Sequence, residues 1–516
     1  MARWSFPALL VLAASLHVMG IGRTLVPAQD GLKFIRIAER FQIDFPYDAV
    51  RGTDQHPLYP ACLAAFEPVF ARMIGHGPRA WRIAAQGISV IASLALIWPL
   101  FRFTRSTFDE STAKLACLLY VLTPSLGQIG IETLSDMLAL LWIMIAIERG
   151  RSALETGRID DWLISGIAVG LGYWTRPECL VAAVAIAAAA CVPGVGSIPR
   201  RTRVVGLVLF AFGAASLFGL YAIVKREPSE KLAFRKQAIK PGSKYLKLRK
   251  VPQWLPKGLD EPRWDFSPKE ESDDAKTLKL DESTVRIAEL WIEGMGFVLA
   301  PFALWGFVRA RSQGPGVWIA RCYSVVFLTA LERHAVKLGY LSHRHVLSLV
   351  LLSIPWTAGG LMVIGRRLAR IFEWDTARKT LLGGCVVAAL LAGGVWARTR
   401  PNHVTRWGHY AAGKWIAENT KPSEAVLDTR GWAAFESTRI SYDYWHVRQA
   451  LTDSKLAIVV VGADELSAPS RRGKTLKALL RRSGELVASF PAERGGVSAD
   501  VLVYRFHRPE TWEGLE

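Results

Sequence analysis

The sequence predicts an α-helical, polytopic membrane protein of about eleven transmembrane helices, followed by a small C-terminal α/β domain. Three observations support this fold class. The chain of 516 residues has a mean hydropathy of +0.21, and 51% of its residues are apolar or aromatic. These residues form long blocks of the length that a membrane-spanning helix needs. After about residue 402, shorter blocks with alternating helix and strand patterns replace them.

Eleven apolar blocks are candidate membrane spans. They cover residues 5–22, 82–101, 113–128, 131–147, 162–175, 178–193, 204–224, 286–308, 316–332, 345–364 and 379–397. Several blocks are shorter than the ~20 residues of a perpendicular span, so their edges are set only to within a few residues. An alternative interpretation of the first block is a signal peptide, with a weak cleavage site at Val26-Pro27-Ala28. We expect the block to be retained as the first span.

The distribution of charge predicts the orientation of the chain. It holds 64 Lys and Arg against 45 Asp and Glu, a formal net charge of +19. With a cytoplasmic N-terminus, the short cytoplasmic loops contain much of this excess, which is the positive-inside pattern. The arginines concerned are at 102, 105, 149, 151, 158, 200, 201, 203, 309, 311, 366, 367 and 370. Topology therefore explains the basic balance, and no nucleic-acid partner is expected.

This orientation divides the chain into a transmembrane domain at 1–400 and an extracytoplasmic domain at 401–516. The first outer loop, 23–80, contains an amphipathic stretch at 57–74 that we expect in the membrane interface. The long outer loop, 225–285, is basic at 225–257 and acidic at 260–282. A solvated loop and a contact to an acidic substrate are equally weighted interpretations of it.

The C-terminal domain is predicted from helix and strand patterns. The expected helices are at 409–419 and 474–482, and the expected strands at 425–428, 456–461, 485–490 and 499–506. About 115 residues are enough for one small α/β domain. The six cysteines, at 62, 117, 179, 191, 322 and 385, lie outside this domain and show no metal or redox spacing.

Ionisable residues at span ends on one membrane face are candidates for a functional site. Asp30 follows the first span, and a carboxylate at the membrane surface suits a general base. Taken alone, Asp30 fits a helix N-cap better than a base. Asp136 is expected at the same face, with capping of the following helix as its alternative role. Arg176 and Glu178 flank Pro177 and are predicted to neutralise each other in a structural role.

The outer loop before the tenth span is rich in cations. It contains His334 and Lys337, and then His343, Arg344 and His345. Cations on an outer face oppose the usual charge bias, so we expect them to meet an anion, either a lipid head group or a phosphate-bearing substrate. Metal binding by His343 and His345 is a weak hypothesis, because no carboxylate pattern accompanies them.

Five segments, in their order along residues 5–365, resemble the polytopic glycosyltransferases with a type C fold. The resemblance is to the bacterial branch of the protein O-mannosyltransferase and aminoarabinose transferase superfamily. Asp30 after an apolar helix is the first segment, and His56-Pro57-Leu58-Tyr59-Pro60 is similar to the family's His/Lys-Pro-Pro-Leu-Tyr turn. The others are Leu134-Ser135-Asp136-Met137-Leu138, Gly172-Tyr173-Trp174-Thr175-Arg176-Pro177-Glu178 and Tyr340-x-x-x-Arg344-His345.

The resemblance implies an integral membrane glycosyltransferase of the cytoplasmic (inner) membrane with an extracytoplasmic active site. It would transfer a single sugar from a polyprenyl-phosphate-linked donor to a cell-envelope acceptor, whether lipid, polysaccharide or protein, with inversion. Asp30 and Asp136 are the implied catalytic residues. The implied substrate-binding residues are His56, Tyr59, His343, Arg344 and His345. No cofactor is required, and a divalent metal is only weakly supported.

One departure from the family pattern concerns the base. The family has two successive carboxylates after the first span, whereas this chain has Asp30-Gly31. Glu39, Asp44, Asp48 and Asp54 of the same loop therefore remain alternative bases. Two other functions also remain open at this point: a transporter or flippase of lipid-linked glycans, and an envelope glycan ligase or polymerase. A transporter should carry ionisable groups near the span midpoints and repeat symmetry, which the sequence does not show.

Overall fold

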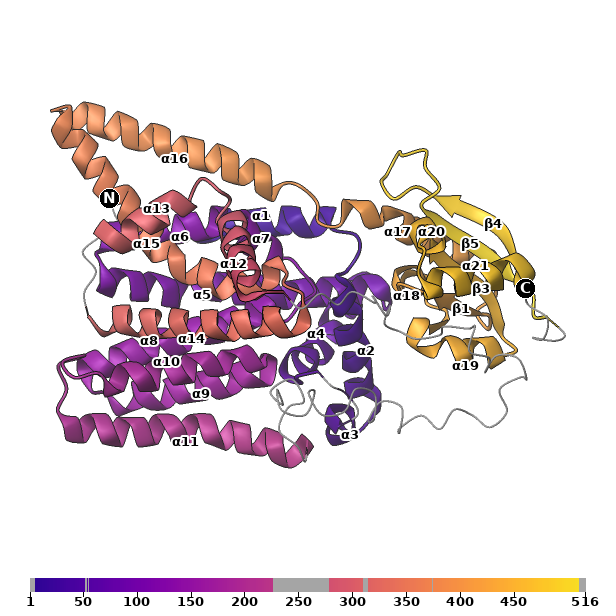
Figure 1. Ribbon diagram of the computed structural model, residues 1–516, viewed down its shortest axis with the longest axis horizontal. Helices are drawn as coiled ribbons and strands as arrows, with labels where there is room; N and C mark the ends of the chain where they lie inside the picture. The colour runs from indigo at the N-terminus through magenta and orange to yellow at the C-terminus, as the bar shows by residue number, and fades with distance from the viewer. Residues whose placement is uncertain are drawn as a thin grey trace.

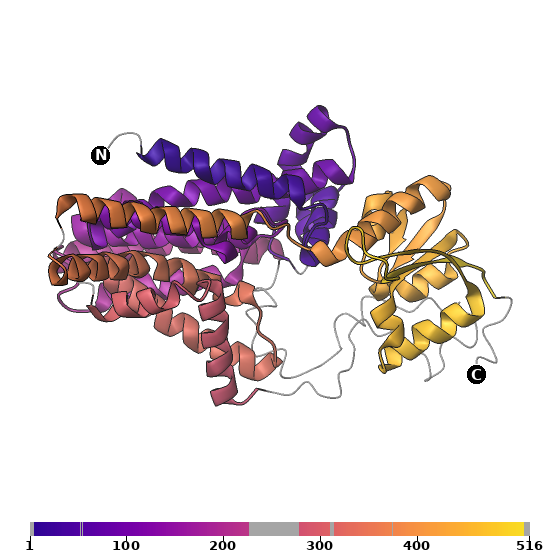
Figure 2. The same ribbon diagram turned by 90° about the horizontal axis from the view of Figure 1, so that it is seen from above.

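The computed structural model describes residues 5–51, 53, 55–225, 278–309, 314–373 and 375–509. It contains a long helical bundle and a smaller part built around a five-stranded sheet (Figure 1). The N-terminus lies at the end of the bundle far from the sheet, in both views (Figures 1 and 2). Most of the predicted loop at 225–285, namely 226–277, lies outside the described residues, as does the alternative base Asp54.

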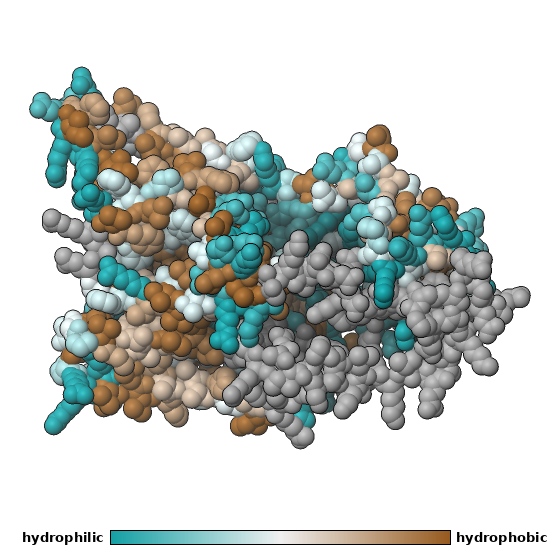
Figure 3. All heavy atoms as spheres, viewed as in Figure 1, coloured by the Kyte–Doolittle hydropathy of each residue, from teal (hydrophilic) through white to brown (hydrophobic). Residues whose placement is uncertain are grey.

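The predicted spans fall on helices of the bundle, but their bounds are not all confirmed. The block at 113–128 is interrupted at Thr123, between α6 (Glu110–Leu122) and α7 (Pro124–Ile129), and the block at 131–147 becomes helical only from Asp136. The long helices of the bundle share one apolar core, and apolar residues dominate the visible bundle surface (Figure 3). Among the described residues, four helical segments are long and apolar enough to cross a membrane: Phe6–Arg23, Pro78–Thr107, Arg200–Lys225 and His343–Ile371. The bundle helices are α1 (Ser5–Arg23), α5 (Pro78–Thr107), α6 (Glu110–Leu122), α8 (Asp136–Thr156), α9 (Ile159–Thr175), α10 (Leu180–Cys191), α11 (Arg200–Lys225), α13 (Ala300–Arg309), α14 (Pro315–Leu338), α15 (Leu347–Ile371) and α16 (Thr376–Arg398).

The block at 286–308 is not one helix, which corrects the prediction of a single span there. α12 (Leu280–Gly294) ends before a turn at 295–299, and α13 begins at Ala300. Gly296 and Phe297 have φ of 70° and 59°, the left-handed region that ends a helix. α12 lies across the bundle axis in both views (Figures 1 and 2). Because the residues of the turn are themselves apolar, hydropathy does not reveal the break.

Short helices cover the end of the bundle that faces the sheet (Figure 1). They are α2 (Gln29–Ile43), α3 (Pro46–Arg51) and α4 (Leu58–Ile74) from the first loop, together with α7 (Pro124–Ile129), η1 (Pro177–Cys179) and η2 (His343–Val346). α4 covers the predicted amphipathic stretch and buries Tyr59 and Leu63 while it exposes Val69 and Met73. This face of the bundle is where the predicted polar residues gather.

The sheet has the strand order β2-β1-β3-β5-β4. β1 (Ala425–Asp428) pairs in parallel with β2 (Ile440–Tyr442) and β3 (Leu456–Gly462), whereas β5 (Val501–Phe506) lies antiparallel between β3 and β4 (Gly484–Phe490). The four predicted strands are confirmed, and the three-residue β2 was not predicted.

Helices cover both faces of this sheet, because alternate residues of each buried strand point to opposite faces. Val426 and Ile458 pack with α17 (Trp407–Asn419) and α18 (Trp432–Ser437) on one face. Leu427 and Val459 pack with α19 (Val447–Thr452) and α21 (Arg471–Ser483) on the other. The predicted helices correspond to α17 and α21. The remaining short helices are η3 (Val404–Arg406), η4 (Tyr444–His446) and α20 (Ala463–Ser467).

Candidate active site

Arg344 joins two of the predicted acidic residues at the end of the bundle that faces the sheet. Its Nη1 donates to Asp30 Oδ2 at 2.8 Å, and its Nη2 donates to Asp136 Oδ2 at 2.8 Å. The Nε of Arg344 also lies 3.2 Å from Asp136 Oδ2. Residues 30, 136 and 344, which are far apart in the sequence, thus form one ionic cluster. We call these three residues the acidic–arginine cluster.

Arg176 extends the cluster from a second side. It forms an ion pair with Asp136 Oδ1, and its Nη2 lies 3.1 Å from Glu178 Oε1. The predicted pairing of Arg176 with Glu178 is therefore confirmed, whereas its contact with Asp136 was not predicted. Asp136 is almost fully buried, with 4% of its side chain exposed, and two arginines together compensate for the burial of its charge.

Each of the three members of the cluster, and Arg176 beside them, is held at the end of a helix. Asp30 lies in the first turn of α2 and Asp136 is the first residue of α8, where the helix dipole favours a carboxylate. Arg344 lies in η2, directly before α15, and Arg176 caps the C-terminal end of α9. Four chain segments thus converge on one point, which is how sequence-distant charges become neighbours.

Gly31, which follows Asp30, lies where there is no room for a side chain. A Cβ added at Gly31 would lie 2.0 Å from Thr133 Oγ1, closer than any side chain can approach. The same Thr133 hydroxyl accepts a hydrogen bond from the Ala28 N–H at 3.0 Å. The missing side chain therefore lets the start of α2 lie directly on the 130–135 turn, which leads into Asp136 and α8.

Asp30 is the accessible acid of the cluster. Its side chain is 45% exposed, and its second oxygen, Oδ1, lies 3.3 Å from Lys33 Nζ. Partial burial acts to raise the pKa of Asp30, but the hydrogen bonds and charges of Arg344 and Lys33 outweigh it, so the pKa lies below the usual Asp value. The carboxylate is therefore ionised at neutral pH and is able to accept a proton.

The other acids of the first loop have different partners. Asp44 Oδ2 accepts from Arg40 Nε at 3.0 Å on the surface. Burial raises the pKa of Glu39, which also lies near the charge of Glu67. Neither residue is part of the acidic–arginine cluster.

The histidines around Arg344 are divided between two environments. His345 Nδ1 accepts the Ser342 N–H at 3.0 Å, and its ring lies 4.9 Å from that of His334, centroid to centroid. Because Nδ1 is an acceptor, the proton of the neutral ring is on Nε2. His343 is more exposed and lies 3.4 Å from Glu293 Oε2 of α12. His334, one of the cations of the loop, is thus a neighbour of His345.

His56 and Tyr59 lie in packed surroundings. The His56 ring is 2% exposed, stacks on Tyr221 at 5.3 Å and meets Tyr173 edge-on at 5.1 Å. Tyr59 is fully buried; its hydroxyl donates to the Ala85 carbonyl at 3.2 Å, and its ring packs on Phe34. These contacts give both residues a packing role in the first loop. Their predicted role in substrate binding remains untested.

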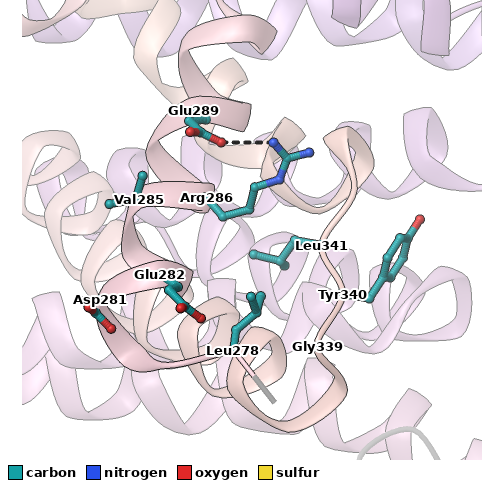
Figure 4. A pocket seen from close by; sticks show the side chains of 9 residues that line it. All are labelled: Leu278, Asp281, Glu282, Val285, Arg286, Glu289, Gly339, Tyr340 and Leu341. Atoms are coloured by element: carbon teal, nitrogen blue, oxygen red, sulfur yellow. Dashed lines mark hydrogen bonds and ion pairs between the residues drawn. The ribbon is translucent and has the colours of Figure 1, made fainter. Parts of the chain in front are cut away.

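A cavity of about 660 Å³ lies between α12 and the segment before η2 (Figure 4). It is bounded by α12 and by the 339–341 segment that leads to Arg344, and its lining does not include Asp30 or Asp136. Arg286 and Glu289 pair within it at 3.0 Å, next to the side chain of Leu341 (Figure 4). Among the described residues, no group of three or more His, Cys, Asp or Glu side chains is placed to hold a metal ion.

The sequence matches a family model for dolichyl-phosphate-mannose-protein mannosyltransferases over residues 55–218. None of the curated proteins compared matches it. Among solved structures, ArnT from Cupriavidus metallidurans bound to undecaprenyl phosphate aligns with a TM-score of 0.59 at 12% identity, over 99% of this chain and 98% of that chain. The chain has the type C glycosyltransferase fold.

Two further structures with this fold align with the chain. The archaeal oligosaccharyltransferase AglB from Archaeoglobus fulgidus, in complex with an inhibitory peptide and a dolichol-phosphate, gives a TM-score of 0.53 at 12% identity, over 97% of this chain and 76% of that chain. The arabinofuranosyltransferase AftD from Mycobacteria gives 0.50 at 14% identity, over 99% of this chain and 42% of that chain. The type C fold predicted from the sequence is therefore confirmed.

Proposed function

We propose that this protein is a multi-pass membrane glycosyltransferase that transfers a single sugar from a polyprenyl-phosphate-linked donor to a cell-envelope acceptor, with inversion. The observation that carries this proposal is the acidic–arginine cluster. In it, an accessible carboxylate lies next to an arginine, a side chain suited to binding phosphate, at one end of a type C fold. ArnT with undecaprenyl phosphate and AglB with a dolichol-phosphate support the class of donor.

Arg344 is the proposed ligand of the donor phosphate. A guanidinium binds phosphate oxygens with two parallel hydrogen bonds, and such charge-assisted bonds are stronger than neutral ones. In the structure, the guanidinium is shared between Asp30 and Asp136. A phosphate that takes the place of Asp30 on Arg344 would release that carboxylate next to the reacting centre, while Asp136 keeps Arg344 in position. The Nε2–H of His345 is a second proposed donor to the phosphate.

Asp30 is the proposed base. The acceptor hydroxyl oxygen forms a bond to the anomeric carbon, and the bond from that carbon to the phosphate oxygen breaks. The acceptor proton passes to Asp30, and the electron pair leaves with the polyprenyl phosphate, whose new negative charge Arg344 stabilises. One displacement inverts the configuration. In this scheme a metal is not needed for the departure of the phosphate.

We place the cluster on the extracytoplasmic face of the cytoplasmic membrane. The part of the chain built around the five-stranded sheet, residues 401–509, lies on the same face, and we call it the sheet domain. The positive-inside pattern supports this orientation, since the arginine-rich loops lie at the opposite end of the bundle. There, Arg102, Arg149 and Arg151 surround the buried Glu148 at 2.9, 3.4 and 3.2 Å. The sugar and the acceptor are not specified by these residues.

Purified protein in lipid nanodiscs tests the proposal directly. It would be incubated with a panel of polyprenyl-phosphate-linked hexoses and pentoses and an envelope extract as acceptor, and the free polyprenyl phosphate would be quantified. We expect one donor to release polyprenyl phosphate only when the acceptor is present. Turnover of nucleotide sugars instead, or movement of lipid-linked glycans across vesicle membranes without any transfer, would contradict the proposal.

A further inference from the structure

The sheet domain holds the chain directly before Asp30 through two hydrogen bonds to one carbonyl. The Pro27 carbonyl oxygen accepts from Trp432 Nε1 at 3.1 Å and from Arg406 Nη1 at 3.2 Å. The guanidinium of Arg406 lies over the Trp432 ring, 4.4 Å from its centroid. Pro27 is three residues before Asp30, so these bonds fix the entry into α2.

An apolar cluster and an ion pair extend this contact along α2. Trp432 packs with Val26 and Leu32, and each of the three is 5% exposed. Arg36 Nη1 lies 2.9 Å from Asp443 Oδ2, and the other oxygen of Asp443 pairs with His446 Nδ1. α18, which begins at Trp432, packs against α2.

These contacts lie on the side of α2 that is turned away from Asp30. At 3.6 residues per turn, Leu32 and Arg36 lie about 200° and 240° around the helix from Asp30. Gly31, about 100° around the helix from both Asp30 and Leu32, lies against Thr133 of the bundle, whose hydroxyl also accepts from the Ala28 N–H. The start of α2 is thus enclosed between the bundle and the sheet domain, and a small movement of the sheet domain would move Asp30 relative to Arg344.

We propose that the sheet domain is a positioning element of the active site, acting through Arg406, Trp432 and Asp443, which we call the α2 clamp. The inference rests on the proposed function, because it assigns the clamp the task of keeping Asp30 beside Arg344 and the donor phosphate that Arg344 would bind. None of the three residues contacts the cluster itself. They are positioning residues, and a displacement of well under the length of a hydrogen bond is enough to reduce a proton transfer that depends on geometry.

Two conservative substitutions test the clamp. Trp432→Phe keeps an aromatic ring but removes the N–H that binds Pro27, and Asp443→Asn removes the charge that pairs with Arg36. Each should lower kcat about 3- to 10-fold, the usual effect of one hydrogen bond or partly exposed ion pair, while the KM for the donor changes less than twofold. The matched controls are Trp415→Phe and Asp453→Asn. Trp415 packs against the sheet core, and Asp453 accepts from Tyr442 at 2.7 Å.

The pH profile separates positioning from folding. In the free enzyme Asp30 is in contact with Lys33 on α2 and Arg344 on η2. A looser α2 should therefore move the acidic limb of the kcat/KM profile, which reports groups of the free enzyme, to higher pH in the clamp variants. A variant that merely unfolds a fraction of the protein lowers activity without moving this limb. Clamp variants that behave like their controls, or that lose activity with an unmoved limb, would overturn the inference.

Hydrogen–deuterium exchange keeps the inference testable if the wild type transfers no sugar, an outcome that contradicts the proposed function alone. The amides of α2 should exchange faster in both clamp variants than in both controls, because the helix has lost its outer support. Unchanged exchange across residues 29–43 would show that the sheet domain does not hold α2.

Discussion

Arg344 is the residue on which the proposed chemistry depends most, because it is bonded to both carboxylates of the cluster. In Arg344→Gln the charge is lost, and the KM for the donor should rise about 10- to 100-fold, the range of a lost charge-assisted hydrogen bond. The KM for the acceptor should change much less. Steady-state kinetics with each substrate varied in turn checks this, with Arg286→Gln as control, since Arg286 pairs with Glu289 on its own helix. Equal effects on both substrates would argue against a phosphate role.

We also expect the pH dependence of sugar transfer to shift in Arg344→Gln. Asp30 acts as a base only when ionised, so transfer is lost as the pH falls through its pKa. In the wild type, Arg344 and Lys33 hold that pKa below the usual Asp value. Without Arg344, the effect of burial remains and the pKa rises, so activity should be lost at a higher pH. The interactions of ionised Asp30 also stabilise the folded protein. This contribution to the free energy of unfolding is present above the pKa of unfolded Asp and is lost as the pH falls through the pKa of folded Asp30.

At the scale of elements, the contact between α2 and the 130–135 turn is the tightest constraint on the site. Gly31→Ala would place a methyl group 2.0 Å from Thr133 Oγ1, so α2 must move away from the turn. Transfer should fall at least tenfold, with a loss of about 1–3 kcal/mol in the free energy of unfolding, the usual result of overpacking. Thermal unfolding and transfer rates per folded protein check this.

A matched glycine separates this effect from a general glycine-to-alanine effect. Gly22 is the residue before the last residue of α1, and a Cβ added there meets no atom within 4 Å. Gly22→Ala should therefore leave transfer and stability unchanged. If Gly31→Ala were also fully active, the close packing of α2 on Thr133 would not be what places Asp30.

The elements that sequence patterns predicted well are those whose own residues show a clear period. β1 has the predicted bounds, because four buried residues lie between polar flanks. The division of 286–308 into α12 and α13 was missed, since apolar residues continue through the turn and only Gly294 and Gly296 signal it. β2 was missed because three residues, two of them exposed, form no recognisable pattern; its pairing with β1 comes from the tertiary structure.

At the scale of the whole molecule, the orientation of the bundle is open to a direct test. In a variant without native cysteines, Lys474→Cys places a thiol on the exposed side of α21, and Arg105→Cys places one at the opposite end of the bundle. In intact spheroplasts, a membrane-impermeant maleimide should label position 474 at once, and position 105 only after permeabilisation. Labelling in the reverse order would place the sheet domain in the cytoplasm and contradict the proposed site.

The sequence placed Asp30, Asp136 and Arg344 on one membrane face, because span ends and arginine-rich loops define the two faces. It did not predict that Arg344 bridges the two acids, nor that Arg176 also binds Asp136, since these pairs join residues 40 to 314 positions apart. The α2 clamp could not be predicted for the same reason, since Trp432 and Pro27 are 405 positions apart and meet only through the tertiary structure. His56 and Tyr59 lie in the turn from which substrate binding was predicted. Their burial could not be predicted from that turn, because it arises from packing against helices α5, α9 and α11.

The central claim is that Asp30 is the base of a sugar transfer. A strain that lacks the gene would be complemented with the wild type, with Asp30→Asn, or with the matched control Asp44→Asn, whose carboxylate pairs with Arg40 instead. Envelope glycans from each strain would be compared by mass spectrometry. We predict that one sugar residue is missing in the deletion and with Asp30→Asn, since loss of a general base costs about 10²- to 10⁴-fold in rate, and that it returns with the wild type and Asp44→Asn. Full restoration by Asp30→Asn would contradict the account.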